Sequence, residues 1–311
     1  MRARALACTA ILLGAGSLGA QVVSRPARAA LAPSHLAVRD NGTWHTWWRS
    51  DRAPVAWNEP AFDLAAHVAW RAAGPAVQWG EMELAGSGEA WRTRVIVARI
   101  DPRRARLTLD TAFADGRAAW SIERAPATAR MAVNAGQFAL SMPWGLVVLG
   151  GHRYLPQGYG PLSSAVLVGA DGAVHWIAGD TALRSITFPV AYAFQSYPTL
   201  LAHDSVPPAL RAPGAGVDLA HRDARLALGR MRDGRLVIAL TRFDAAGGAL
   251  GFVPFGLTIP EMAAVMGALG ARDAVALDGG ISAQLLVRDD EGAHAWPGVR
   301  KVPLALLVFD R

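Results

Sequence analysis

A chain of 311 residues, 52% of them hydrophobic, is long and apolar enough to bury a substantial core. Its net charge of +6 would suggest a nucleic-acid partner, but Arg2, Arg4, Arg25 and Arg28 supply +4 of that charge. The remainder is close to neutral, contains a single lysine and has no long basic run interleaved with aromatic residues. Nucleic acid is therefore excluded as a partner.

The first 29 residues have the pattern of a secretory signal peptide. Residues 1–4 carry positive charge, residues 5–23 are apolar, and Ala27-Arg-Ala29 offers the small residues of a cleavage site. An uncleaved anchor is the competing interpretation, because the apolar stretch approaches the roughly 20 residues that span a bilayer. We favour cleavage, since early glycines and alanines weaken a span. The mature chain is then exported, periplasmic or extracellular, without stable membrane insertion, and it lacks Cys8 and hence any disulfide.

Residues 30–89 form a predicted extension that is rich in tryptophan. Its indole side chains belong to Trp44, Trp47, Trp48, Trp57, Trp70 and Trp79. Packing against the following domain is the favoured use of these rings, with sugar stacking and docking of a protein partner as alternatives. Residues 61–72 predict a short helix between prolines.

Residues 90–311 form the predicted main domain, in which strands dominate. Alternating patterns predict a hairpin of residues 91–100 with 105–110, a second of 165–168 with 174–177, and a third of 225–229 with 236–241. Further strands are predicted over residues 131–133, 146–149, 274–277 and 302–309. Largely antiparallel sheets with few flanking helices indicate a single domain of the α+β class.

An aspartate follows a buried strand near the end of this domain. Thr258-Ile-Pro-Glu261 has the form of a capping box, and the apolar residues that follow at helical spacing predict a helix over 258–269. The apolar strand 274–277 then leads into Asp278, Gly279 and Gly280, where glycines allow a ligand to approach the backbone. The competing interpretation is a solvated Asp-Gly turn.

Several motifs then occur in a characteristic order: Asn134-Ala-Gly-Gln-Phe138, Pro143-Trp-Gly145, Tyr197-Pro-Thr-Leu200, Arg225-Leu-Ala-Leu-Gly229, Arg232-Asp-Gly-Arg235 and Leu277-Asp-Gly-Gly-Ile-Ser282. In this order they resemble the phosphodiester glycosidase domain family, over roughly residues 90–309. The sequence departs from the family at Ala135, Gln137 and Ile281, and Thr241-Arg-Phe243 replaces an Asp-Gly pair that members often have. These changes weaken the expectation of catalysis more than that of the fold.

The resemblance implies hydrolysis of a glycosidic bond to phosphate, in an envelope or extracellular glycopolymer. Asp278 is then expected to act on water or to stabilise cationic charge, and Arg225 to bind the phosphate through its fork, with Asn134 as the third catalytic candidate. The expected substrate-binding residues are Ser282, Gly279, Gly280, Gly136, Gln137 and His221. We expect no cofactor and no metal, and interpret the Asp289-Asp-Glu-Gly292 run as a solvated turn. The alternative function is a non-catalytic carbohydrate-binding protein with the same fold.

Overall fold

The computed structural model describes residues 32–59, 62–112, 118–139, 141–179, 186–214, 216–245, 253 and 255–311. The signal peptide expected over residues 1–29 lies outside these residues, so the choice between cleavage and anchoring stays a prediction. Within the described ranges, no helix is long and apolar enough to cross a membrane.

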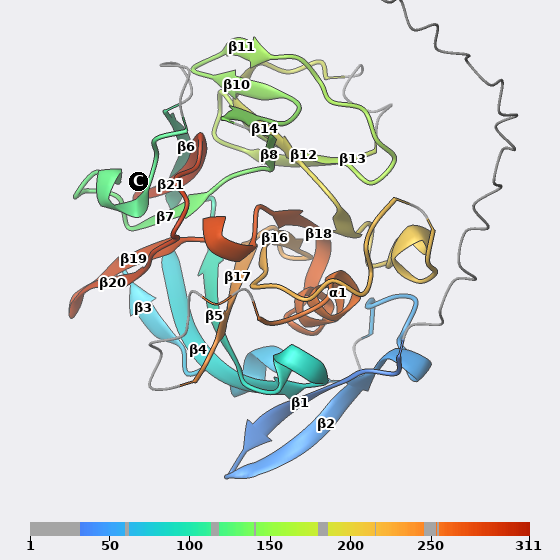
Figure 1. The fold of residues 1–311 in the computed structure, drawn as a ribbon. Coiled ribbons are helices and arrows are strands. Elements are labelled where there is room, and N and C mark those ends of the chain that lie inside the picture. Colours follow the sequence, from blue (N-terminus) through green and yellow to red (C-terminus); the bar gives the residue numbers. More distant parts are fainter. Residues whose placement is uncertain are drawn as a thin grey trace, which may run out of the picture. The chain divides into compact units, whose positions relative to one another are not determined.

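A nine-stranded sheet forms the centre of the domain (Figure 1). Its order along the sheet is β15 (Thr199–Leu201), β18 (Ala271–Leu277), β16 (Leu226–Met231), β17 (Leu236–Phe243), β5 (Thr93–Ile100), β4 (Val77–Gly86), β1 (His35–Asp40) and β2 (Thr43–Arg49), with β3 (Arg71–Ala73) paired to β4. The strands of the tryptophan-rich segment therefore join the same sheet as those of the main domain, across the boundary predicted near residue 90.

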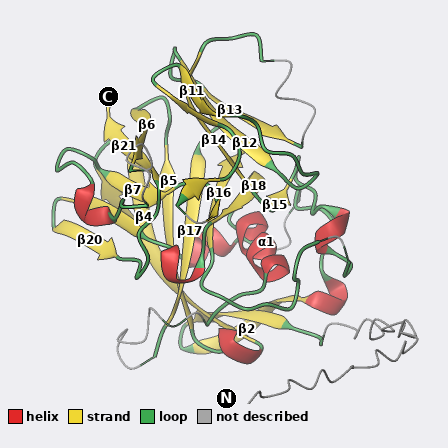
Figure 2. Ribbon diagram, turned by 45° about the horizontal axis from the view of Figure 1, so that its top comes forward, coloured by secondary structure: helices red, strands yellow, loops and turns green. Residues whose placement is uncertain are grey.

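Two five-stranded sheets and a two-stranded ribbon complete the strands of the described residues (Figure 2). One sheet contains β11 (His152–Leu155), β10 (Val147–Leu149), β14 (Val190–Ser196), β12 (Ser164–Gly169) and β13 (Val174–Ala178). The other contains β20 (Gly292–Trp296), β19 (Leu285–Asp289), β7 (Met131–Asn134), β21 (Leu304–Asp310) and β6 (Ala105–Thr111), and β8 (Phe138–Ala139) pairs with β9 (Met142–Pro143). All pairs between these strands are antiparallel, as predicted.

The two faces of the nine-stranded sheet contribute to different cores. On β17, Val237 and Ala239 pack into the core that includes α1, whereas Ile238 and Leu240 pack with residues of the two five-stranded sheets. This alternation follows from the two-residue period of a strand, which sends successive side chains to opposite faces. Apolar side chains therefore cover both faces of β17 along most of its length, and the polar residues Thr241 and Arg242 lie near its end.

The helix α1 (Ile259–Ala268) lies beside β15, β16 and β18 (Figure 1). The predicted capping box is confirmed, since the Thr258 hydroxyl accepts from the Glu261 N–H at 3.3 Å and the Glu261 carboxylate accepts from the Thr258 N–H at 2.9 Å. Among the described residues it is the single α-helix, and short 3-10 turns are Ser50–Arg52, Leu64–His67, Gly88–Ala90, Ile122–Arg124, Pro208–Leu210 and Gly280–Ser282. The α+β class with few helices is confirmed.

One predicted hairpin is wrong. The strands β5 and β6 follow one another around a turn at residues 101–104, but β5 pairs with β4 and β17 whereas β6 pairs with β21. The chain crosses there from one sheet to another, a choice that the local turn signal does not encode. The other two predicted hairpins are confirmed as β12–β13 and β16–β17. The helix expected over 61–72 shrinks to the 3-10 turn at Leu64–His67, after which β3 begins.

Most of the tryptophans before residue 90 are packed rather than displayed. Trp48, Trp57 and Trp79 are buried, and Trp47 stacks on Phe62 with ring centroids 5.5 Å apart. Trp44, in contrast, is 45% exposed on β2. The burial of Trp48, Trp57 and Trp79 agrees with the favoured interpretation, in which these rings pack into the cores of the domain. Docking of a protein partner stays a prediction.

Candidate active site

Three neighbouring strands of the nine-stranded sheet, β18, β16 and β17, bring polar residues together where their ends meet. Leu226 on β16 lies opposite both Leu277 on β18 and Leu240 on β17. The residues one step beyond these three are Arg225, Asp278 and Thr241, and antiparallel pairing places them together. The Thr241 hydroxyl accepts from the backbone N–H of Arg225 at 2.7 Å, which fixes this arrangement.

The end of β7 holds the turn after β18. The Asn134 side chain donates from Nδ2 to the Asp278 carbonyl at 2.9 Å, and its Oδ1 accepts from the Gln284 N–H at 2.9 Å. The Asp278 N–H donates to the Gly136 carbonyl at 3.0 Å. Asn134 is only 1% exposed, and its amide positions the backbone of the turn.

The two glycines after Asp278 are required by a close approach of the preceding loop. A side chain on Gly279 would place its Cβ 2.5 Å from the Ala224 carbonyl oxygen, and one on Gly280 would place it 2.6 Å from Asp223 Oδ2. Gly280 also has a φ of +56°, which disfavours other residues. The pair therefore brings the Asp278 turn into contact with the loop that carries Asp223.

Asp278 is a poorly compensated carboxylate. Burial raises its pKa to about 6, which a hydrogen bond from the Ser282 hydroxyl and the charge of Arg300 only partly offset. The neighbouring charge of Asp223 raises the pKa of Asp278 further. A group with this pKa exchanges its proton readily near neutral pH, as acids and bases of active sites do.

Asp223 is a second carboxylate that the sequence analysis did not propose. Burial raises the pKa of Asp223, against the opposing influence of Arg225. His221, 59% exposed at its side chain, places Nε2 3.6 Å from Asp223 Oδ2. The signal that could have identified Asp223 is the β16–β18 pairing, which places the residues before Leu226 beside those after Leu277.

Arg225 is fixed beside these carboxylates by backbone carbonyls. Its Nε donates to the Leu257 carbonyl at 2.8 Å and its Nη2 to that of His221. Burial lowers the pKa of Arg225, and Asp223 opposes this shift. A guanidinium has five N–H donors, so two carbonyl bonds orient the fork and leave donors for an anion.

Arg242 supports the turn after β18. Its side chain lies on the opposite face of β17 from that of Thr241, the preceding residue. It is 7% exposed and donates through Nη2 to the carbonyls of Ala283 and Pro297, the latter at 3.2 Å. Burial lowers the pKa of Arg242 to about 10, so the group remains charged at neutral pH. Asp223 is the charge that favours this cation.

The loop carrying Asp223 is anchored to the start of α1. Arg222 donates to Glu261 through Nη1 and Nη2, both at 2.7 Å, and its Nη1 also donates to the Gly256 carbonyl at 3.1 Å. Glu261 is fully buried and caps the helix at the same time. One carboxylate therefore couples the helix terminus to the loop that contributes Asp223 and Arg225.

The remaining predicted residues divide between the turn and its margins. Ser282 is buried at 2% exposure, and its hydroxyl bonds the Asp278 carboxylate, so it positions that carboxylate. Gln137 lies toward Tyr197, whose carbonyl accepts from Gln137 Nε2 at 3.1 Å. Ile281 is 45% exposed, so its side chain lies on the surface of the turn. Several predicted residues thus lie around Asp278, and Asn134 and Gly136 hydrogen-bond with its backbone.

A cluster of potential metal ligands lies elsewhere, at Asp289, Glu291 and His294. The Asp289 carboxylate already accepts from His294 Nε2 at 2.9 Å and from Trp79 Nε1 at 3.0 Å. The backbone N–H groups of Glu291 and Gly292 also donate to it. These bonds satisfy both carboxylate oxygens, so the cluster is explained as a hydrogen-bonded turn.

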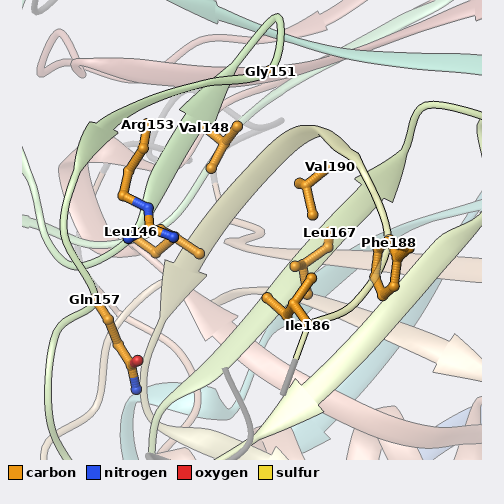
Figure 3. Close-up of a pocket in the computed structure, with 9 residues that line it drawn as sticks. All are labelled: Leu146, Val148, Gly151, Arg153, Gln157, Leu167, Ile186, Phe188 and Val190. Carbon is orange, nitrogen blue, oxygen red and sulfur yellow. The ribbon is translucent and has the colours of Figure 1, made fainter. Parts of the chain in front are cut away.

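A cavity of about 460 Å³ also lies outside the carboxylate site (Figure 3). It is lined by Leu146, Val148, Gly151, Arg153, Gln157, Leu167, Ile186, Phe188 and Val190. Several of these side chains form the small apolar cluster of the β10–β14–β12 sheet, and none is a candidate catalytic residue. The candidate site is therefore defined by the polar residues around Asp278 and not by this cavity.

Comparisons with known proteins show the family and the fold of the chain. The sequence profile of the phosphodiester glycosidase family matches residues 127–309. The fold is similar to that of the zebrafish N-acetylglucosamine-1-phosphodiester alpha-N-acetylglucosaminidase catalytic domain auto-inhibited by pro-peptide, with a TM-score of 0.57, 14% identity, and coverage of 78% of this chain and 86% of that one. No curated protein sequence matches the chain.

Two further structures are more distantly similar. A hypothetical protein from Synechocystis matches with a TM-score of 0.46 and 17% identity, over 76% of this chain and 62% of that one. A putative exported protein from Burkholderia pseudomallei K96243 matches with a TM-score of 0.42 and 17% identity, over 70% of this chain and 74% of that one.

Proposed function

Because this chain belongs to the phosphodiester glycosidase family, we propose that it is an exported hydrolase that cleaves a sugar-1-phosphodiester bond in an envelope or extracellular glycopolymer. The observation that carries the proposal is Asp278, whose pKa burial raises to about 6 and which lies near Asp223. The pairing of β16 with β18 places Arg225 at the start of the neighbouring strand. The signal-peptide pattern of residues 1–29 supports the exported part of the proposal.

Asp278 acts in this mechanism as the base for water. Its ionised carboxylate accepts a proton from water while the water oxygen bonds to the anomeric carbon. The bond from that carbon to the phosphate oxygen breaks, and its electron pair leaves on the phosphate. The carboxylate also stabilises the positive charge that develops at the anomeric carbon. The products are the free sugar and a phosphomonoester.

Arg225 binds the phosphate in the same proposal. Its guanidinium is held by the Leu257 and His221 carbonyls and lies near Asp223, so its position is set before substrate arrives. A fixed fork stabilises charge that grows on the departing phosphate oxygens. Burial raises the pKa of Asp223, and the charge of its carboxylate favours the cationic form of Arg225.

The first test is turnover by the full-length chain. A panel of α- and β-linked sugar-1-phosphate methyl esters is incubated with the protein and followed by phosphorus NMR. We expect at least one phosphodiester signal to convert into a phosphomonoester signal, with one free sugar released per phosphate. Binding without conversion, detected by calorimetry, would instead favour the non-catalytic carbohydrate-binding function. Absence of both would reject both functions for the sugars tested.

A further inference from the structure

We infer that the cavity of about 460 Å³ on the sheet formed by β11, β10, β14, β12 and β13 binds a small amphiphilic anion. The ligand class is a single aliphatic chain that ends in a carboxylate or a phosphate. Binding at this site does not depend on the proposed hydrolysis, because the cavity contains none of the candidate catalytic residues. Its volume falls within the roughly 300 to 1,000 Å³ of small-molecule sites.

The register of this sheet places four residues in one row. Arg153 on β11 lies opposite Val148 on β10, and Val148 lies opposite Ala193 on β14. Ala193 in turn lies opposite Leu167 on β12. Residues opposite one another in antiparallel strands share a face of the sheet, and Arg153, Val148 and Leu167 all line the cavity. The row therefore presents a cation at the edge strand and apolar side chains farther in.

The cavity is elongated across the strands. Arg153 and Leu167 are three strands apart, which corresponds to roughly 14 Å between their backbones at about 4.8 Å per strand. Ala193, between Val148 and Leu167, is buried and has a small side chain, so the middle of the row leaves space above the sheet. An extended chain fits this shape better than a compact ring does.

The far end of the cavity is bounded by apolar side chains. His175 on β13 lies opposite Leu167, and its ring stacks on Phe188 with centroids 4.0 Å apart. Phe188 and Ile186 line the cavity from the segment before β14. These side chains offer carbon surface to a ligand, and burying an aliphatic chain against them removes apolar area from water.

Arg153 and Gln157 supply a polar end. In Figure 3 their side chains lie on the left of the cavity, whereas those of Ile186 and Phe188 lie on the right. Among the nine described residues that line the cavity, Arg153 is the one with a charge at neutral pH. The ion pairs of the described residues do not include Arg153. The lining is therefore divided into a cationic end and an apolar end.

This division selects the ligand class. A guanidinium binds a carboxylate or a phosphate through two parallel N–H···O bonds, which suits an anionic head group at Arg153. A sugar would leave hydroxyl groups without partners against Ile186 and Phe188, and burial of an unpaired polar group is costly. A cationic ligand would be repelled by Arg153. An aliphatic anion satisfies both ends of the cavity.

The test measures the binding of octanoate, octyl phosphate and octanol to the full-length protein by calorimetry. We expect both anions to bind, and the tighter of the two identifies the head group. Hexanoate should bind about 10-fold more weakly than octanoate, because it buries two methylenes fewer. Acetate and inorganic phosphate, which lack the chain, should show no binding at the same concentrations.

Two substitutions separate the head group from the chain. Arg153→Gln should weaken octanoate about 5-fold and leave octanol unchanged, because only the charged contact is lost. Val190→Phe places a larger side chain at the cavity wall and should weaken octanoate and octanol alike, by about 10-fold or more. If that variant does not fold, Phe188→Ala removes part of the apolar wall and should weaken both about 5-fold.

Arg39→Gln is the matched control, because Arg39 is also an exposed arginine on a strand but belongs to the nine-stranded sheet. It should leave every dissociation constant unchanged, and so should Asp278→Asn. Octanoate binding no tighter than acetate would overturn the site. Equal losses of octanoate and octanol in Arg153→Gln, or unchanged binding in both wall variants, would overturn it as well. A loss in Asp278→Asn would place the anion at the Asp278 turn and contradict the cavity.

Discussion

Two aspartates on or next to the same strand have opposite surroundings. Asp273, within β18, is fully buried and accepts from Arg230 at 3.1 and 2.7 Å and from the His203 N–H at 2.9 Å. Asp278, just past the end of β18, has the Ser282 hydroxyl as its side-chain donor, the positive charge of Arg300 nearby and Asp223 as a like charge. Full pairing stabilises the folded chain, whereas incomplete pairing preserves reactivity at some cost in stability.

The largest expected effect is on turnover. Asp278→Asn removes the group that accepts the water proton while keeping the size of the side chain, and it should lower kcat by about 1,000-fold or more. The rate is measured on whichever phosphodiester of the panel the wild type hydrolyses. A rate within a few-fold of wild type would assign the base to another residue, with Asp223 the next candidate.

Asp273→Asn should have its main effect on stability. Loss of the carboxylate charge leaves Arg230 without its buried ion pair, so the free energy of unfolding should fall by about 3 to 5 kcal/mol. Denaturant titration at pH 7.5 measures this difference. The kcat of the protein that remains folded should stay near wild type, since Asp273 pairs with Arg230 and His203, neither of which is a candidate site residue. A large loss of kcat without loss of stability would reverse the assignment of the two aspartates.

The pH dependence of stability provides a smaller effect with a defined sign. The pKa of Asp278 rises from 3.8 to about 6 on folding, so its protonated form favours the folded state. That contribution is complete below about pH 4 and is lost as the pH rises through about 6. Relative to Asp278→Asn, the wild type should therefore lose roughly 2 to 3 kcal/mol between pH 4 and pH 7.5. Turnover should change in the opposite direction, falling below about pH 6, because the ionised carboxylate is the active form. Parallel stability curves for the two proteins would contradict the assigned pKa.

Local sequence signals predicted one side of the site well. The capping box at Thr258 and Glu261, the apolar strand that follows α1, and the glycines after Asp278 are all properties of short segments. They held because helix capping and strand burial depend on residues close in sequence. Asp223 was missed because its partner lies 55 residues away, and only the pairing of β16 with β18 brings the two together.

The failures have the same physical origin. The turn at residues 101–104 looks like a hairpin turn, yet it joins strands of different sheets, which depends on the positions of β17 and β21. The catalytic role expected of Asn134 stays a prediction. Its amide also bonds the backbone of Asp278 and Gln284, which lie far away in the sequence and which the local motif does not encode. Two residues of Thr241-Arg-Phe243, noted only as a departure from the family, contribute to the candidate site. Thr241 binds the Arg225 backbone, and Arg242 supports the turn.

The most direct test measures the turnover and the stability of Asp278→Asn and of wild type in one buffer at pH 7.5. The two quantities should move in opposite directions. The variant should unfold at a higher denaturant concentration than wild type and should release sugar from the phosphodiester at least about 1,000-fold more slowly. A variant that hydrolyses at the wild-type rate, or that is less stable than wild type, would contradict the claim that Asp278 is kept incompletely paired for catalysis.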